Sequence, residues 1–214
     1  MLIREARTSD LPQIVAIHRV AFAGFFMTEL GHRFLKAYYR QVLDFPNHLF
    51  LVCQNMLDAP IEGFVAGFTN PHEFYNLLKK HKWYLALCAL AHLIVRPHRW
   101  THALASLRRA QSLTQPHRES LRIAELASLA VHPQAQGKGI GKALVLAFLE
   151  LAQEQGVQKV YLTTDASNNE AVNSFYQRLG FRLSHQFWHT PQRLMNEYVY
   201  DLYNKQVKSR GEHK

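Results

Sequence analysis

The chain has few of the residues that build disulfide scaffolds or zinc ribbons. Its 214 residues include two cysteines, Cys53 and Cys88, and each lies in an apolar stretch. Isolated thiols of this kind exclude a disulfide framework and the paired cysteine ligands of a ribbon. We therefore expect no metal site and a reducing, cytoplasmic setting.

Long apolar runs are also lacking. The longest near-apolar stretch, residues 83–95, contains a histidine and is shorter than the roughly 20 residues that cross a bilayer. Residues 1–7 show neither the basic region nor the apolar core of a signal peptide. We therefore expect neither a transmembrane segment nor a secretion signal.

Acidic side chains are scarce in one segment, which carries most of the net charge. The formal charge is +9, and residues 72–121 hold eight basic and two acidic side chains, so this segment contributes +6. A positive field suits nucleic acid and an anionic cofactor equally, so charge alone does not choose between them. With 48% hydrophobic and 19% charged residues, the composition is that of a globular domain and excludes a disordered or collagen-like chain.

The order of hydrophobic patterns predicts one domain over residues 1–204, in which strands alternate with helices. We expect strands at 2–6, 48–53, 61–68, 122–131, 157–163, 181–185 and 196–203, and helices between the cap at 8–10 and Gly24, at 30–42, at 139–153 and at 168–179. Apolar and basic residues at 72–121 predict a helical insertion. The polar, basic residues 205–214 predict a disordered tail.

The most informative segment is a glycine-rich turn between a predicted strand and a predicted helix. Gly137, Gly139 and Gly141 let the backbone approach a ligand, and the first amides of the following helix have no intrahelical partner. Such a turn binds phosphate, although a tight turn with glycines for packing is equally compatible with these residues alone. The spacing matches neither the Rossmann nor the Walker pattern.

Two motifs at the expected separation resemble the GNAT superfamily of N-acetyltransferases. The first, Gln/Arg-x-x-Gly-x-Gly/Ala, is matched by Gln136, Gly139 and Gly141. The second is matched by Asn168, Ala171, Phe175, Tyr176, Gly180 and Phe181. The motifs cover residues 122–182, and the order of elements in residues 1–70 also agrees with the family. The insertion at 72–121 lies outside the usual pattern.

The resemblance implies an α/β fold with a mixed, mostly antiparallel central sheet flanked by helices, and places the helical insertion between the third and fourth strands. It also implies acetyl-CoA as cosubstrate, with the pyrophosphate on the amides of the turn and the pantetheine beside a strand that splays from its neighbour. The residues assigned to the cofactor are Leu129, Ala130, Val131, Gln136, Gly137, Lys138, Gly139, Ile140, Gly141, Lys142 and Asn168. Solvated charges at Lys138 and Lys142, and a helix cap at Asn168, are the alternative interpretations.

Acetyl transfer to an amine calls for a base, because a lysine-like amine has a pKa near 10.4 and is protonated at neutral pH. Glu125 is our candidate. It lies six residues before Val131, the offset of the glutamate base in the histone-acetylating branch of the family. The alternative is an exposed carboxylate paired with Arg122, and His132 is a second candidate base.

An acid is expected for the departing thiolate. Tyr176 matches the tyrosine that lies near the cofactor sulfur in many family members, although a core aromatic is the alternative interpretation. Thr163 departs from the ribosomal-protein N-terminal acetyltransferase branch, which has glutamate at this place, so that branch's base is missing here.

The acceptor is not specified by either motif. We expect direct attack on the thioester by a primary amine of a small molecule or amino sugar. Protein lysines, protein N-termini and a non-catalytic acyl-CoA-binding module stay open. For residues 72–121 we expect a helical lid, with a dimer contact, a peripheral membrane contact or a nucleic-acid contact as alternatives. We expect no nucleic-acid partner and a monomer or homodimer.

Overall fold

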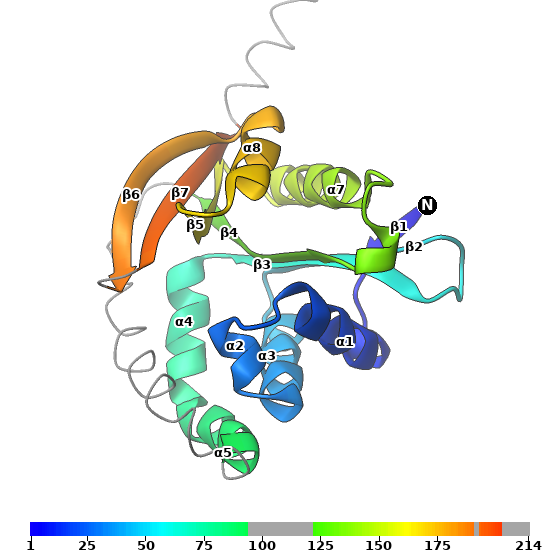
Figure 1. The fold of residues 1–214 in the computed structure, drawn as a ribbon, viewed down its shortest axis with the longest axis vertical. Helices are drawn as coiled ribbons and strands as arrows, with labels where there is room; N and C mark the ends of the chain where they lie inside the picture. Colours follow the sequence, from blue (N-terminus) through cyan, green and yellow to red (C-terminus); the bar gives the residue numbers. More distant parts are fainter. Residues whose placement is uncertain (94–121, 191–192, 203–214) are drawn as a thin grey trace, which may run out of the picture.

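The computed structural model describes residues 1–93, 122–190 and 193–202 (Figure 1). The helices are α1 (Leu11–Ala21), α2 (Phe26–Glu29), α3 (His32–Asp44), α4 (Pro71–Lys80), α5 (Lys82–Leu93), α7 (Ile140–Glu154) and α8 (Glu170–Arg178). The strands are β1 (Leu2–Glu5), β2 (His48–Gln54), β3 (Ile61–Thr69), β4 (Ile123–Val131), β5 (Lys159–Asp165), β6 (Arg182–Thr190) and β7 (Arg193–Asp201). Short 3-10 turns precede α1 and α7, at Thr8–Asp10 and Pro133–Ala135.

The strands form one sheet in the order β1-β2-β3-β4-β5-β7-β6. Every neighbouring pair is antiparallel except β4 and β5, which run parallel. The parallel pair arises because α7 carries the chain from the end of β4 back to the start of β5, as a crossover connection does. The predicted α/β fold with a mixed, mostly antiparallel sheet is confirmed.

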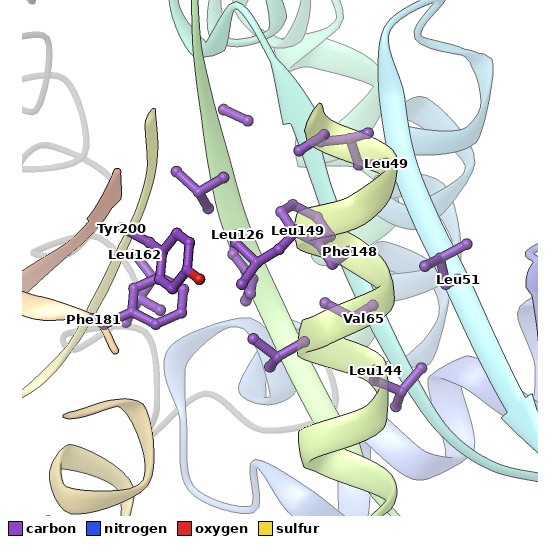
Figure 2. Packing of buried hydrophobic residues seen from close by; sticks show 14 of the residues in the cluster. Leu49, Leu51, Val65, Leu126, Leu144, Phe148, Leu149, Leu162, Phe181 and Tyr200 are labelled. Atoms are coloured by element: carbon purple, nitrogen blue, oxygen red, sulfur yellow. The ribbon is translucent and has the colours of Figure 1, made fainter. Parts of the chain in front are cut away.

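Helices cover both faces of this sheet, with α7 and α8 on one face and α1 to α4 on the other (Figure 1). In the first layer, Leu144, Phe148 and Leu149 of α7 pack with Val65 and Leu126 of the central strands (Figure 2). Full burial of each such side chain contributes about 1.5–3 kcal/mol to folding. This layer therefore fixes α7, and the glycine turn before it, against the sheet.

The opposite layer is mainly aromatic. Phe74 of α4 stacks on Phe68 of β3 with ring centroids 3.8 Å apart, and Tyr39 of α3 meets Phe64 of β3 at 5.4 Å. Aromatic pairs of this kind add to the stability that burial itself provides. They hold α3 and α4 against β3, so α4 lies next to the following strand, β4.

Two predicted helix boundaries are wrong. The helix expected from residue 30 begins at His32, because Gly31 has a φ of 91° and separates it from the short α2. The helix expected from Asn168 begins at Glu170, and Asn169 occupies the capping position. Asn168 itself has a positive φ of 55°, which takes it out of the helix and removes the cap alternative.

The first part of the predicted insertion is helical, as expected, and consists of α4 and α5. Residues 94–121, and the tail predicted at 205–214, lie outside the described part of the chain. Of the helices that the structure describes, none combines the length and apolarity needed to cross a bilayer.

Candidate active site

The site is organised around a gap between two parallel strands. β4 pairs with β5 only through Ile123–Glu125, whose partners are Lys159–Tyr161. A β-bulge at Ala127 bends β4 directly afterwards, while β4 stays paired with β3 on its other side. Within the described sheet, the amides of residues 126–131 that face β5 therefore have no strand partner. The predicted pantetheine residues, 129–131, lie in this unpaired run.

Glu125 occupies the last paired position before the strands diverge. Its Oε2 accepts a hydrogen bond from the Tyr161 hydroxyl at 2.7 Å, and its Oε1 accepts one from the Tyr75 hydroxyl at 2.9 Å. Burial, reinforced by the charge of Glu125, raises the pKa of both tyrosines, so both stay protonated and donate at neutral pH. Arg122, the alternative partner predicted for Glu125, instead lies with its Nη1 beside Gly156.

A second carboxylate lies on the same face of the sheet. Glu197 of β7 is 7% exposed and lies opposite Thr163 of β5. Besides burial and Glu125, its charge raises the pKa of Tyr161. Its ion-pair partner among the described residues is His185, whose Nδ1 lies 3.5 Å from Glu197 Oε1 and attracts it when protonated. The carboxylates of Glu125 and Glu197 thus flank the Tyr161 side chain.

The loop between α1 and α2 reaches the same side of the sheet. The guanidinium carbon of Arg193, at the start of β7, lies 5.5 Å from the ring centre of Phe25 in this loop. The same guanidinium donates to Asp165 at the end of β5, from Nε to Oδ1 at 2.6 Å and from Nη2 to Oδ2 at 3.0 Å. This bidentate pair and the cation–π contact join the loop to the ends of two strands.

The glycine turn presents free backbone amides at the start of α7. Gly137 and Gly139 have φ values of 80° and 79°, a left-handed conformation that glycine adopts without steric penalty. The first helical bond runs from the Ala143 amide to the Gly139 carbonyl at 3.0 Å, and no described backbone hydrogen bond uses the amides of residues 137–142. A Cβ built on either glycine meets no atom within 4 Å. Open space beside amides that no described backbone bond uses fits a phosphate group.

Side chains around this turn divide into exposed and anchoring groups. Gln136, Lys138 and Lys142 are exposed, whereas Ile140 is buried and attaches the turn to the core. The Nζ of Lys138 lies 3.6 Å from Glu62 Oε1. A surface pair of this kind contributes at most about 1 kcal/mol, so Lys138 can exchange Glu62 for another anion.

Tyr176 lies on the opposite face of the sheet from Glu125. It belongs to the α7–α8 layer, is 7% exposed, and packs its ring on Phe181 and Tyr198 at centroid distances of 5.6 and 6.5 Å. Burial raises the pKa of its hydroxyl. The predicted acid and the predicted base therefore approach the sheet from opposite sides, which the gap between β4 and β5 connects.

A buried polar chain runs from β4 into α1. Tyr39 is hydrogen-bonded to Ser128 beside the bulge, and its hydroxyl lies 2.7 Å from Nδ1 of His18. His18 is 3% exposed, and burial lowers its pKa to about 4. Its Nε2 has no hydrogen-bond partner within the described residues. His18 is therefore neutral at physiological pH and is part of the core.

Comparison with known protein families identifies the family of this chain. A family model described as the acetyltransferase (GNAT) family matches residues 12–181, which is most of the chain. The chain belongs to the GNAT acetyltransferase family. The resemblance predicted from the two motifs is confirmed, and so is the prediction of an acyltransferase.

Sequence relatives of this GNAT acetyltransferase share one segment with it. A mycothiol acetyltransferase from Pseudarthrobacter chlorophenolicus is 51% identical over 59 residues, which is 28% of this chain. One from Nocardia farcinica is 41% identical over 63 residues, or 29% of this chain. The matched segments span 18% and 20% of the relatives' own lengths, a fifth of them or less.

Solved structures share the fold over nearly the whole chain. The ribosomal-protein-S18-alanine N-acetyltransferase from Escherichia coli superposes with a TM-score of 0.57 at 17% identity, covering 94% of this chain and 93% of that one. An N-acetyltransferase from Staphylococcus aureus gives a TM-score of 0.59, also at 17% identity, with 94% and 98% covered. Identities this low show the fold alone.

The two candidate bases lie far apart in this GNAT fold. His132 lies at the opposite end of β4 from Glu125, about 20 Å away at the rise of an extended strand. Its Nδ1 accepts a hydrogen bond from the Gln134 amide at 3.3 Å. Glu125 and His132 therefore cannot act on the same atom. Glu125 lies where β4 and β5 separate, and His132 follows the far end of the unpaired run.

Sequence reasoning missed three residues around Glu125. Tyr161 carried a usable signal, because a register of β4 and β5 pairs it with Glu125 on one face. No sequence signal pointed to Tyr75, because it belongs to α4, at the start of the insertion that lies outside the two family motifs. Gly67 was also missed, although a glycine inside a strand often marks a bulge or a close approach of backbones.

Proposed function

We propose that this GNAT acetyltransferase transfers the acetyl group of acetyl-CoA to the primary amine of a small molecule or amino sugar. The position of Glu125 carries the proposal. Its carboxylate is oriented by two tyrosine hydroxyls and lies where β4 and β5 separate. A general base must be within hydrogen-bond reach of the attacking amine, and this position serves a molecule that enters the gap.

Acetyl-CoA, when bound, supplies the acetyl group as a thioester that an amine can attack directly. In the proposal, the free amides of residues 137–142 bind its pyrophosphate, with Lys138 and Lys142 adding positive charge. Gln136 and Asn168 are assigned to the cofactor through the two family motifs that they match. The unpaired amides of residues 129–131 bind pantetheine as a neighbouring strand would. The open space at the glycine turn and the missing strand partner support this assignment.

Glu125 is the proposed base. At neutral pH only about one lysine-like amine in a thousand is unprotonated, so an attacking amine must first lose a proton. The Glu125 carboxylate accepts this proton directly or through a water molecule. Tyr75 and Tyr161 hold the two carboxylate oxygens, and their raised pKa keeps both as donors throughout. The tyrosines therefore orient the base and do not compete for the proton.

Tyr176 is the proposed acid. Burial raises its pKa, so its hydroxyl carries a proton at the moment when a thiolate forms. It lies on the α8 side of the sheet, whereas Glu125 lies on the α4 side. In the proposal the acceptor amine loses its proton on the α4 side of the gap, and the departing thiolate gains one on the α8 side. The amine and the thioester meet in the gap between these two sides.

Charge supports a small, cationic acceptor. Glu125 and Glu197 both lie on the α4 side of the sheet, and their combined field attracts an ammonium ion. The name of the matched relatives, mycothiol acetyltransferase, also supports a small-molecule acceptor. A protein N-terminus is the second candidate, because the Escherichia coli enzyme with this fold is named for ribosomal protein S18. Thr163, which stands where that branch has glutamate, ranks it below the small amine.

A screen of amines with released thiol as the readout tests the proposal. Glucosamine, a short diamine, a peptide with a free N-terminus and a peptide with an internal lysine would each be incubated with acetyl-CoA and the protein. We expect thiol release with the amino sugar or the diamine and none with the peptides. Turnover of a peptide alone would favour the second candidate, and cofactor binding without turnover of any amine would favour a non-catalytic module.

A further inference from the structure

An exposed apolar and basic surface lies where α4 meets α5. We call it the α4–α5 corner and define it by Lys79, Lys80, Lys82, Trp83, Tyr84 and Leu87. Trp83 is 77% exposed, Leu87 66% and Tyr84 53%. Adjacent apolar side chains that are this exposed mark interaction surfaces rather than ordinary surface positions.

The other face of α5 is buried against the rest of the protein. Leu85 and Ala89 are each 6% exposed, and Ala89 forms a small cluster with Leu30, which precedes α3. On a helix, Leu85 and Ala89 lie on the face opposite to Trp83 and Leu87, so α5 is apolar on both sides. Figure 1 shows that α4 carries α5 away from the sheet, at a distance from the glycine turn. This surface is therefore separate from the candidate active site.

The charge of the α4–α5 corner has one sign. Residues 74–93 contain no Asp or Glu, and the carboxylate of Glu73 lies in the first turn of α4, at the opposite end of that helix from Lys79 and Lys80. The Nζ of Lys82 lies 5.6 Å from the ring centre of Trp83. Two copies of the chain docked through this surface would bring their lysines together and repel each other. The complementary partner must instead be negatively charged and must also accept indole and leucine side chains.

We propose that the α4–α5 corner docks on an anionic lipid surface. Tryptophan and tyrosine rings favour the boundary between headgroups and acyl chains, and lysines beside them reach anionic headgroups. Trp83, Tyr84 and Leu87 enter this boundary while Lys79, Lys80 and Lys82 lie along the headgroups. The inference rests on α4 and α5 alone and does not require acetyl transfer.

Vesicle co-sedimentation of the full chain tests this. Phosphatidylcholine vesicles with about one quarter phosphatidylserine should sediment the protein, and pure phosphatidylcholine vesicles should not. Lys79→Gln/Lys80→Gln should weaken binding by about 30-fold, the value that about 1 kcal/mol per lysine gives. Trp83→Ser/Leu87→Ser should weaken it at least about tenfold, because the apolar area that enters the boundary is lost.

The matched control is Met56→Ser/Leu57→Ser. These side chains are 64% and 71% exposed, and they lie in the β2–β3 turn away from the lysine cluster. This variant should bind vesicles as the wild type does. Equal binding to neutral vesicles, an equal loss in the control, or no loss in the corner variants would overturn the proposal. A wild-type dimer that Trp83→Ser/Leu87→Ser abolishes would overturn it in favour of a second copy.

Discussion

Gly67 of β3 faces the backbone of Glu125 so closely that a Cβ at residue 67 would overlap the Glu125 carbonyl oxygen. The ring of Phe148 in α7 would meet the same Cβ at 2.8 Å. The absence of a side chain lets β4 approach β3 at the bulge. This close approach sets the position of Glu125 at the gap.

Gly67→Ala should therefore displace Glu125. Overpacking at such a site lowers the free energy of unfolding by about 1–3 kcal/mol. Turnover should fall by more than acetyl-CoA affinity, because the new Cβ overlaps the Glu125 carbonyl oxygen directly and meets α7 only at Phe148, more than two helical turns after the glycine turn. Urea unfolding, calorimetric titration and a rate assay measure the three quantities. Lower stability with unchanged turnover would show that this contact does not position Glu125.

Glu125→Gln keeps the size of the side chain and removes its ability to take a proton. With a lysine-like acceptor, the rate at pH 7 should fall by about 10²–10⁴ and should recover as rising pH deprotonates the free amine. A weakly basic acceptor should lose less. The pH–rate profile is the measurement, and Glu150→Gln on the exposed face of α7 should match the wild type. A small loss that is independent of pH would contradict the assignment.

Two substitutions at Gly139 separate backbone strain from charge. Asn and Asp both tolerate the left-handed φ of 79° better than other side chains, and both enter open space. Gly139→Asp should abolish acetyl-CoA binding, because its charge repels the pyrophosphate, whereas Gly139→Asn should weaken binding less. Calorimetry compares them. Gly24→Asp, at a φ of 84° in the α1–α2 loop, should leave the affinity unchanged. Equal affinities for the two Gly139 variants would place the phosphate elsewhere.

Tyr176→Phe should lower kcat and leave acetyl-CoA affinity within a few fold, as expected for a proton donor used only in the transition state. Tyr198→Phe is the matched control, because its ring lies in the same layer, 6.5 Å from Tyr176. Steady-state rates and calorimetric titration of both variants give the comparison. If the two substitutions reduce kcat equally, Tyr176 acts through packing.

His18 should make stability depend on pH. Its pKa is about 4 in the folded protein and about 6.5 in the unfolded chain, so only the unfolded state binds the proton between these values. The stabilisation is complete above pH 6.5 and is lost as the pH falls to about 4, by a total of about 3 kcal/mol. His18→Gln should flatten the unfolding free energy across this window, whereas His132→Gln should not. Urea unfolding at several pH values checks this, and parallel profiles would contradict it.

The strands and the glycine turn could be predicted because their signals are local. Alternating apolar residues define β4, and Gly137 and Gly139 mark the turn through the φ values that they alone adopt readily. The predicted strands lie within a few residues of those observed, apart from the longer hairpin of β6 and β7. Gly31 is different. Its positive φ separates α2 from α3, so the helix predicted from residue 30 begins at His32.

The surroundings of Glu125 could not be predicted in the same way. Tyr75 and Tyr161 lie 50 and 36 residues from it along the chain, and only the folded sheet brings them together. The sequence also offered His132 as a base, because position along a strand does not tell at which residue β4 separates from β5. Contacts between distant segments depend on register, and register is set by the whole sheet.

The unpaired run of β4 also bears on how the protein avoids aggregation. Residues 126–131 pair with β3 alone in the described sheet. The sheet therefore has an unpaired strand edge between β4 and β5, in addition to the edges at its two ends. Proteins usually protect such edges with charge or proline, and this run, Leu-Ala-Ser-Leu-Ala-Val, contains neither. Under the proposed function, pantetheine occupies this edge. Cellular acetyl-CoA would then protect the fold from extended segments of other chains as well as supply the acetyl group.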